Sequence, residues 1–254
     1  MQDELLVERQ DGLMVLTINR PQARNAMNRA VAEAMAKAME ELEADDSLRV
    51  GILTGAGGNF CTGMDLKSFL RGERPTGGGR GFGGVTEKPP RKPLLAAVEG
   101  YALAGGFELV LACDLIVAAS SARFGLPEVK RGLAAAAGGL MRLPRRLPYH
   151  VAMQTILTGG MMTAERAAHF GLVNEVCPDG QALASAKRLA AEIVANAPMG
   201  ILTSKRIVQQ SRLWSDEEMF ARQAPHTDAV LQSEDAREGA AAFAEKRAPV
   251  WRGR

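Results

Sequence analysis

The sequence predicts an α/β fold with a mainly parallel sheet, followed by a helical C-terminal region. Short β-prone runs alternate with segments of helical spacing between residues 5 and 176, as they do in chains that form parallel sheets. From about Gln181 the spacing is helical throughout. In addition, 46% of the 254 residues are hydrophobic, which is enough to bury a substantial core.

The first expected elements are a hairpin and a helix. Residues 5–9 and 13–19 are β-prone and are joined around Asp11-Gly12, a pair typical of tight turns. We expect Asn25 or Asn28 to cap the helix that follows, because an Asn side chain can accept a hydrogen bond from a free N–H of the first turn. The apolar side of this helix repeats at helical intervals through Val31, Met35, Met39 and Leu42.

The remaining elements of the α/β region are strands, a helix and a loop. Residues 71–93 hold many Gly and Pro and have no apolar periodicity, so we expect a mobile surface loop there. A helix is expected over residues 107–113, and strands are expected over residues 50–54, 94–98, 115–119 and 172–176.

Composition indicates a soluble, cytoplasmic protein. Lys and Arg number 31 against 29 Asp and Glu, a net charge of +2, so the total implies neither a nucleic-acid partner nor an anionic membrane. The opening MQDELLVERQ does not have the pattern of a targeting peptide, and no apolar run approaches the ~20 residues that span a bilayer. Cys61, Cys113 and Cys177 are far apart, as expected for buried, reduced thiols.

Several common kinds of site are not indicated. There is no GxSxG elbow and no P-loop, and the isolated His150, His169 and His226 do not have the spacing of a metal site. A GxGxxG occurs at residues 79–84, but no predicted strand precedes it, as a dinucleotide site requires. The same GGGRGFGG is similar to an Arg-Gly RNA-binding segment, although a single copy in a nearly neutral chain favours a flexible flap.

Two segments are left as candidates for chemistry: FCTGMDL at residues 60–66 and YALAGGFEL at residues 101–109. Each follows a predicted strand and carries glycine where the chain turns, so the backbone can approach a ligand and N–H groups point outward. Two such turns facing each other would make an oxyanion hole, which stabilises negative charge on a carbonyl oxygen. The alternative is a pair of ordinary tight turns.

Two glutamate carboxylates are further candidates for the chemistry. Glu108 comes just after the second turn, and Glu128 lies in ARFGLPEVKRGL. Burial would raise the pKa of either group toward neutrality, as general acid–base catalysis requires, whereas a helix N-terminus would lower that of Glu108. Each could instead be an exposed carboxylate at the start of a helix. Together with two N–H turns, they suit chemistry at the α and β carbons of an acyl group.

At these residues the sequence resembles the crotonase family, the enoyl-CoA hydratase/isomerase superfamily. NRPQARNAMN is similar to the family's NRPxxxNAL, FCTGMDL to F[SC]xGxD[LI], and KPLLAAVEGYALAGGFELVLACD to KPxIAAVxGxAxGGGxELxxxCD. ARFGLPEV, LTGGMMTAERAAHFGLVNEV and the closing AFAEKRAPVWRGR also fit family patterns. Six motifs in register cover nearly the whole chain.

The resemblance implies a role for each matching residue. The backbone N–H groups of Met64 and Gly105 would form the oxyanion hole, and Glu108 and Glu128 would hold and activate water. Two segments would line the coenzyme A (CoA) moiety, through Arg24, Ala26, Thr62, Asp65 and Leu66. A C-terminal FxEK element, which often reaches CoA from a neighbouring subunit, would add Phe243 and Lys246. Asp65 and Asp114 have a structural interpretation as well, in which they bond nearby backbone.

The resemblance also implies the fold, the partners and the reaction. The fold would be a spiral of ββα units over residues 1–195, with a helical trimerisation region over 196–254, in a trimer or a dimer of trimers. The substrate would be an acyl-CoA thioester, and neither a metal nor a separate cofactor would be needed. Two glutamates favour an enoyl-CoA hydratase over an isomerase or another acyl-CoA reaction; a non-catalytic CoA- or RNA-binding protein is the alternative of another class.

The match departs from the family pattern beyond Glu128. GLAAAAGG at residues 132–139 has Ala135 and Ala136 where the family usually has Pro-Gly. If that position needs a positive φ, alanine would force the turn to rearrange. Arg131 stands where relatives more often have an apolar residue, and we expect it to be a solvated charge, with contact to a polar acyl group as the alternative.

Overall fold

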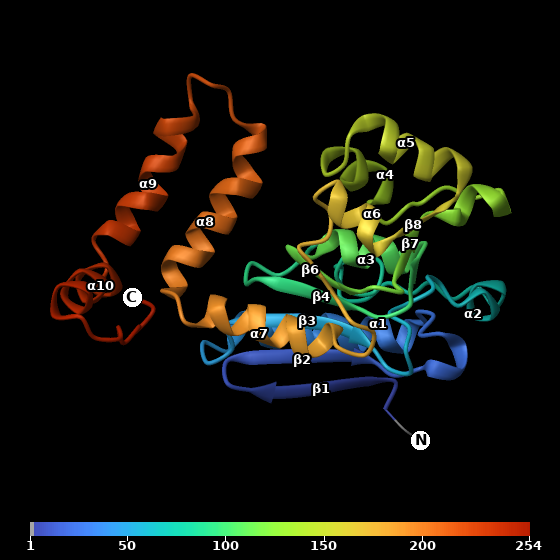
Figure 1. The fold of residues 1–254 in the computed structure, drawn as a ribbon, viewed down its shortest axis with the longest axis horizontal. Helices are drawn as coiled ribbons and strands as arrows, with labels where there is room; N and C mark the ends of the chain where they lie inside the picture. Colours follow the sequence, from blue (N-terminus) through green and yellow to red (C-terminus); the bar gives the residue numbers. More distant parts are fainter. Residues whose placement is uncertain (1–2) are drawn as a thin grey trace.

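Residues 3–254 are described by a computed structural model, in which strands and helices wind into a layered core and a helical arm extends from one end (Figure 1). The larger sheet has the order β1-β2-β3-β4-β6-β9. Its strands are β1 (Leu5–Gln10), β2 (Leu13–Ile18), β3 (Val50–Gly55), β4 (Leu94–Val98), β6 (Leu115–Ala119) and β9 (Glu175–Cys177). Every neighbouring pair except β1–β2 is parallel, which confirms the predicted class.

The smaller sheet was not predicted from the sequence. It has the order β5-β7-β8, with β5 (Tyr101–Leu103), β7 (Arg123–Gly125) and β8 (Met161–Thr163). Strands of three residues are too short to show an alternating pattern. The last strand of the large sheet was also misplaced: the structure has it at Glu175–Cys177 and not at 172–176.

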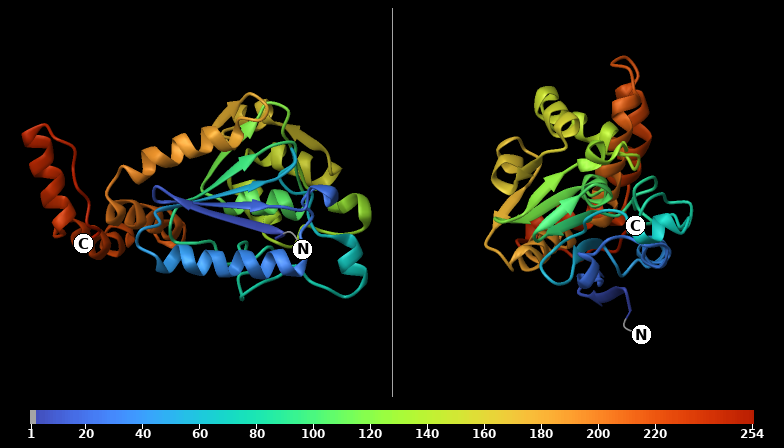
Figure 2. Two further views of the ribbon diagram at one scale, coloured as in Figure 1. Left: turned by 90° about the horizontal axis from the view of Figure 1, so that it is seen from below. Right: turned by 90° about the vertical axis from the view of Figure 1, so that its right-hand side faces the viewer.

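Two helices sandwich the large sheet (Figure 2). Side chains of β2 alternate between the faces: Met14, Leu16 and Ile18 pack with α1 (Arg29–Ala44), whereas Leu13 and Val15 pack with α7 (Ala182–Val194). Asn28 caps α1 by accepting a hydrogen bond from Val31 N at 2.9 Å. Asn25, the other predicted cap, is instead fully buried and donates to the carbonyls of Ala56 and Asn59.

The prediction of a surface loop over residues 71–93 is wrong for residues 80–86. Arg80, Val85 and Thr86 are at most 3% exposed. The glycines of this segment permit close packing on α1: a Cβ added to Gly77 would lie 2.3 Å from the carbonyl oxygen of Ala32, and one added to Gly84 would lie 2.5 Å from the same atom. The high glycine content of this segment therefore reflects close packing on α1 and not a mobile loop.

The helical C-terminal region forms the arm. It contains α8 (Pro198–Gln210), η4 (Ser211–Leu213), α9 (Met219–Leu231) and α10 (Glu234–Glu245). Of the residues that the structure describes, none in α8, η4 or α9 is buried. The final residues fold back toward the end of α7, where Trp251 Nε1 donates to the carbonyl of Ala195 at 2.7 Å.

The remaining helices are short and surround the smaller sheet and the sheet edges (Figures 1 and 2). They are η1 (Pro21–Ala23), α2 (Leu66–Leu70), α3 (Gly105–Ala112), η2 (Pro127–Arg131), α4 (Gly139–Arg142), η3 (Leu143–Arg145), α5 (Tyr149–Thr158) and α6 (Ala164–His169). Within residues 3–254, every helix is too short or too polar to cross a membrane.

Candidate active site

The two predicted turns lie against each other. A Cβ added to Gly63 would lie 2.9 Å from the Cβ of Ala104 and 3.3 Å from the backbone nitrogen of Gly105. A Cβ added to Gly106 would lie 2.0 Å from the carbonyl oxygen of Cys61, so glycine is required there. From the sequence we expected these glycines to let the backbone approach a ligand. In the structure, Gly63 and Gly106 allow one turn to approach the other.

Each turn presents a backbone N–H without a partner. Met27 N donates to Gly63 O at 2.7 Å and Asp65 N donates to Met27 O at 2.9 Å, so the intervening N–H of Met64 points away from Met27. Gly105 is the first residue of α3, where an N–H has no partner within the helix. Neither N–H has an acceptor within residues 3–254. This arrangement is suited to an oxyanion.

Strain at Ala104 accompanies the second turn. Its φ of 51° and ψ of −129° lie in a region that favours glycine. Ala104 N donates to Gly125 O at 2.9 Å, and Ala104 O accepts from Glu108 N at 3.0 Å. These contacts with β7 and α3 hold the strained conformation, which directs the chain into α3.

Glu108 is buried and held by backbone. Only 3% of the residue is exposed, so the alternative of a solvated carboxylate is wrong. Its Oε1 accepts hydrogen bonds from Ala137 N at 2.7 Å and Gly139 N at 2.8 Å. Burial raises the pKa of Glu108, while these two N–H groups and the nearby Arg142 charge oppose the rise; the net direction is upward.

Glu128 lies on η2 and is half-buried. Its Oε2 is a buried oxygen without a hydrogen-bond partner in residues 3–254. Burial raises the pKa of Glu128 from 4.5 to about 7, and the negative charge of Glu108 adds to the rise. The two carboxylates are therefore close enough to influence each other, and their surroundings differ.

The altered turn after Glu128 has no strain at its alanines. The left-handed residues of this segment are Gly132, with φ of 67°, and Gly138, with φ of 104°, whereas Ala135 and Ala136 do not take a positive φ. The turn supplies both N–H groups that bond Glu108. Arg131 is exposed, as predicted for a solvated charge.

The residues predicted to line CoA come together in two segments beside Met64. Arg24 O accepts a hydrogen bond from Thr62 N at 3.2 Å, and the Met27–Met64 bridge joins the same segments. Arg24 and Leu66 are exposed, while Ala26, Thr62 and Asp65 are half-buried. The Asp65 carboxylate already caps α2 through Lys67 N and binds Arg20 at 2.9 Å, which confirms its structural interpretation.

The structure does not bring Phe243 and Lys246 to this site. Phe243 is 88% exposed on α10, and Lys246 follows that helix in a left-handed conformation. In Figure 1, α10 lies at the far end of the arm, on the opposite side of the molecule from α2. Within one chain these two residues therefore have no contact with Met64, Gly105 or the glutamates.

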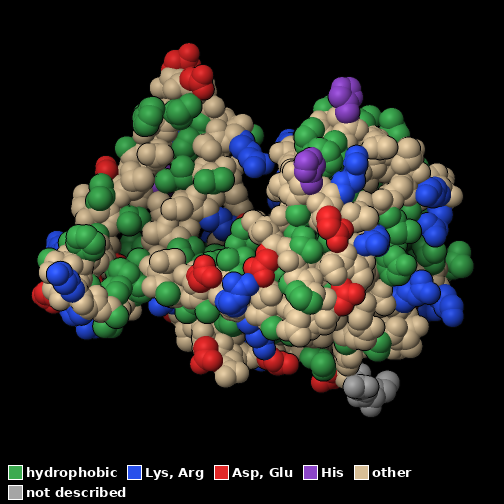
Figure 3. Space-filling model, in the orientation of Figure 1, with side chains coloured by type: hydrophobic (Ala, Val, Ile, Leu, Met, Phe, Trp, Pro, Cys, Tyr) green, Lys and Arg blue, Asp and Glu red, His purple; other side chains and the backbone are tan. Residues whose placement is uncertain are grey.

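A large cavity lies away from this site. It has a volume of about 1210 Å³ and lies between the arm and the core, where Figure 3 shows a hollow. Asp114 forms an ion pair with Lys205 in its wall and accepts from Leu94 N at 2.8 Å, which is the structural role predicted for Asp114. None of the residues predicted for catalysis or CoA binding lines this cavity.

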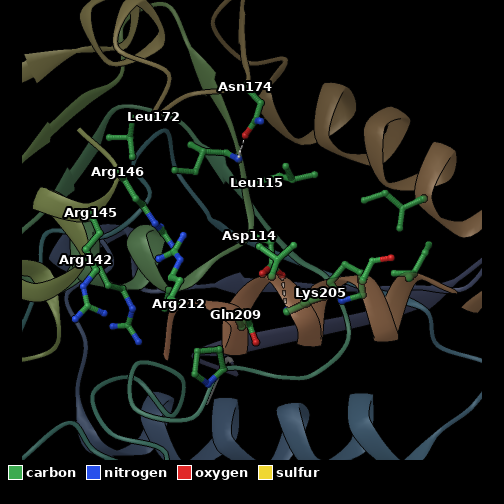
Figure 4. Close-up of a pocket in the computed structure, with 18 of the residues that line it drawn as sticks. Asp114, Leu115, Arg142, Arg145, Arg146, Leu172, Asn174, Lys205, Gln209 and Arg212 are labelled. Carbon is green, nitrogen blue, oxygen red and sulfur yellow. Dashed lines mark hydrogen bonds and ion pairs between the residues drawn. The ribbon is translucent and has the colours of Figure 1, made fainter. Parts of the chain in front are cut away.

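Arginines gather on one wall of the cavity (Figure 4). Arg145, Arg146 and Arg212 have no side-chain acceptor within residues 3–254. Burial lowers the pKa of Arg146, and the positive charges of Arg142 and Arg212 lower it further. Arg145 and Arg212 are exposed, so water can solvate their charges.

The residues that support Glu108 were not predicted from the sequence. Arg142 donates to the carbonyls of Thr86 and Ala137, at 2.5 and 3.3 Å, and so joins the 80–86 segment to the turn that bonds Glu108. The backbone partners Ala137 and Gly139 lie in GLAAAAGG, whose glycines were a usable signal. Nothing in the spacing of Arg142 distinguishes it from other arginines.

Known proteins are similar to this chain over its whole length. A family described as enoyl-CoA hydratase/isomerase matches residues 8–254. A carnitinyl-CoA dehydratase of Salmonella arizonae is 42% identical over 261 residues, covering 100% of both chains. The solved enoyl-CoA hydratase EchA1 of Mycobacterium marinum is 56% identical, with a TM-score of 0.97 over 100% of both chains. The solved carnitinyl-CoA hydratase of Mycobacterium avium is 45% identical, with a TM-score of 0.81 over 100% of both chains.

These matches extend over the core, the site and the arm together. The crotonase-type fold predicted from the motifs is therefore confirmed. The chain belongs to the enoyl-CoA hydratase/isomerase family, the crotonase family, and is an enzyme of its hydratase/dehydratase class that acts on CoA thioesters.

Proposed function

We propose that the protein is an enoyl-CoA hydratase that adds water across the double bond of a 2-enoyl-CoA thioester. The observation that carries this proposal is the pairing of two differently held carboxylates, Glu108 and Glu128, beside two turns with free N–H groups. Hydration needs one group to take a proton from water and another to give a proton to carbon, and it builds negative charge on the thioester oxygen.

The environments of the glutamates support separate roles. Glu108 accepts two backbone hydrogen bonds, which favour its ionised form, so we assign it the removal of a proton from water. The pKa of Glu128 is raised to about 7, so a large fraction of it is protonated near neutral pH, and we assign it proton delivery. In the step, the water oxygen bonds to the β carbon, its proton passes to Glu108, and the α carbon takes a proton from Glu128.

The N–H groups of Met64 and Gly105 would hold the thioester oxygen while it carries negative charge. One such donor is typically worth about 3 kcal/mol of transition-state stabilisation. CoA would run along the exposed edge formed by Arg24, Ala26, Thr62, Asp65 and Leu66. CoA enters as part of the substrate, and the proposed step needs no other cofactor and no metal.

We further propose that the protein is a homo-oligomer built through the arm. Helices α8 and α9 bury no described residue, and Leu213 and Phe220 are 87% and 75% exposed. Large apolar side chains exposed in this way favour burial against another subunit. The distance of α10 from the site also means that Phe243 and Lys246 could contact CoA only in another subunit. A cytoplasmic location is supported by the free thiols of Cys61, Cys113 and Cys177, as is usual in reducing compartments.

Three alternatives compete with hydration of a simple enoyl chain. The relatives named for carnitinyl-CoA support a substrate with a polar acyl group, in a reaction that removes or adds water. A double-bond isomerase needs only one carboxylate, so the second one disfavours it. RNA binding by GGGRGFGG is disfavoured because Arg80 is 3% exposed and its segment packs on α1.

The proposal is tested by measuring turnover of crotonyl-CoA by the wild type and by the variants Glu108→Gln and Glu128→Gln. Loss of the absorbance of the conjugated thioester reports hydration, and CoA binding is measured separately. We expect the wild type to turn over and both variants to bind CoA normally. A wild type that binds crotonyl-CoA without consuming it would contradict the proposal.

A further inference from the structure

The glycine-rich segment GGGRGFGG has no role in the mechanism proposed so far. Its glycines bring the chain against α1, and this places Phe82 beside the active site. A Cβ added to Gly105 would lie 2.3, 2.6 and 2.9 Å from three carbons of the Phe82 ring. The ring therefore covers the α carbon of the residue that offers its N–H to the thioester oxygen.

This contact fixes how near the ring is to the reacting atoms. A Cβ lies about 2.5 Å from its own backbone nitrogen, so the ring edge is within about 5 Å of Gly105 N. The carbon of a thioester group whose oxygen is bonded to that N–H would lie about 4 Å from the same nitrogen. The ring would meet the acyl chain within its first few carbons.

Other contacts join the segment that carries Phe82 to the turn that holds Glu108. Thr86 N donates to Phe82 O at 3.3 Å, and Thr86 O accepts from Arg142, which also donates to Ala137 O. Ala137 N is one of the two donors to Glu108. Residues 82–86 thus connect Gly105, whose α carbon the Phe82 ring covers, to the turn that holds Glu108.

The segment that carries Phe82 is firmly held. Thr76 and Phe82 form an antiparallel bridge, Gly83 N donates to Pro75 O at 2.8 Å, and Glu87 N donates to Arg80 O at 2.9 Å. The next residue has no free space either, because a Cβ added to Gly83 would lie 2.8 Å from Leu109. An acyl chain cannot displace the ring by moving a loose flap.

We propose that Phe82 is a specificity-determining residue that closes the acyl site and limits it to short acyl groups of about four carbons. This inference rests on the proposed function, because it assumes that the acyl group is bound at the N–H of Gly105. It gives the GGGRGFGG segment a role: the glycines allow the approach, and the single aromatic residue forms the wall.

The test is the ratio of the dissociation constants for butyryl-CoA and octanoyl-CoA, measured by calorimetry. Each additional methylene that becomes buried is worth about fourfold in affinity. We expect the wild type to gain nothing from the four extra methylenes of octanoyl-CoA. In Phe82→Ala we expect the ratio to shift by at least ~20-fold toward octanoyl-CoA, with Phe82→Leu between the two.

Phe220→Ala is the matched control, because it removes the same ring from an exposed position on α9, far from the site. If the ratio for Phe82→Ala stays within threefold of the wild-type ratio, the inference is overturned. If Phe82→Ala does not fold, the same threefold limit applied to Phe82→Leu decides the test. Saturated thioesters need no turnover, so this ratio tests the wall even if crotonyl-CoA is not hydrated. Hydration with an unchanged ratio would refute the wall alone.

Discussion

The substitution Glu128→Gln should reduce activity and at the same time change how stability depends on pH. The carboxyl of Glu128 has a pKa raised from 4.5 to about 7, mainly by burial. Folding therefore favours its protonated form, so the stability it contributes is full below pH 4.5 and is lost as the pH rises through 7. Between pH 5 and pH 8 a shift of this size corresponds to about 2.5 kcal/mol of unfolding free energy.

Part of the Glu128 side chain reaches solvent, so we expect about 2 kcal/mol of this pH dependence in practice. Glutamine does not titrate, and the other ionisable groups are common to both proteins. Urea unfolding followed by circular dichroism at pH 5 and pH 8 gives the difference directly. The wild type should lose about 2 kcal/mol relative to Glu128→Gln across this range, while the variant is at least ~100-fold slower in hydration. If the unfolding free energies of the two proteins change in parallel with pH, the raised pKa of Glu128 and the burial that causes it are refuted.

Three more predictions follow from the site and the arm. Glu108→Gln keeps an oxygen to accept from Ala137 N and Gly139 N, so we expect normal unfolding but at least ~100-fold slower turnover; steady-state kinetics with near wild-type rates would contradict its role. Ala104→Gly should raise stability by about 1 kcal/mol in urea unfolding, because φ of 51° and ψ of −129° strain an alanine; no gain would show that the turn is unstrained. Asp114→Ala leaves the Lys205 ammonium, whose side chain is 11% exposed, without its carboxylate, and should cost about 3 kcal/mol in the same assay; a loss below 0.5 kcal/mol would mean that the pair contributes little.

The sequence pattern was sufficient for α1 and for the strands of the large sheet other than β9. Its central strands β3 and β4 are buried on both faces, so they read as continuous apolar runs, and α1 carries its apolar residues at helical spacing. The smaller sheet has strands of three residues, below the length at which alternation is visible. The segment 80–86 was misread because glycines that pack against a helix look the same in a sequence as glycines of a loop.

The candidate site could be predicted residue by residue only where motifs were in register. The two glycine turns and Glu108 were read from the residues, whereas the roles of Met64 and Gly105 came from the family resemblance; the structure brings the two turns together. Phe82 and Arg142 were not predictable, because their roles depend on contacts with residues 23 and 34 positions away in the chain: Gly105 for Phe82, and Glu108 for Arg142. Phe243 and Lys246 are predicted for CoA but lie on the arm, which a single chain does not fold over its own site.

Incubation with a series of 2-enoyl-CoA thioesters in heavy-oxygen water, followed by mass spectrometry of the products, tests the central claim most directly. We predict that heavy oxygen enters the acyl chain of the short substrates, beyond a control without enzyme, and that Glu108→Gln and Glu128→Gln incorporate at least ~100-fold less in the same time. Recovery of the unsaturated substrates without heavy oxygen, or with the double bond moved, would contradict hydration by these two glutamates.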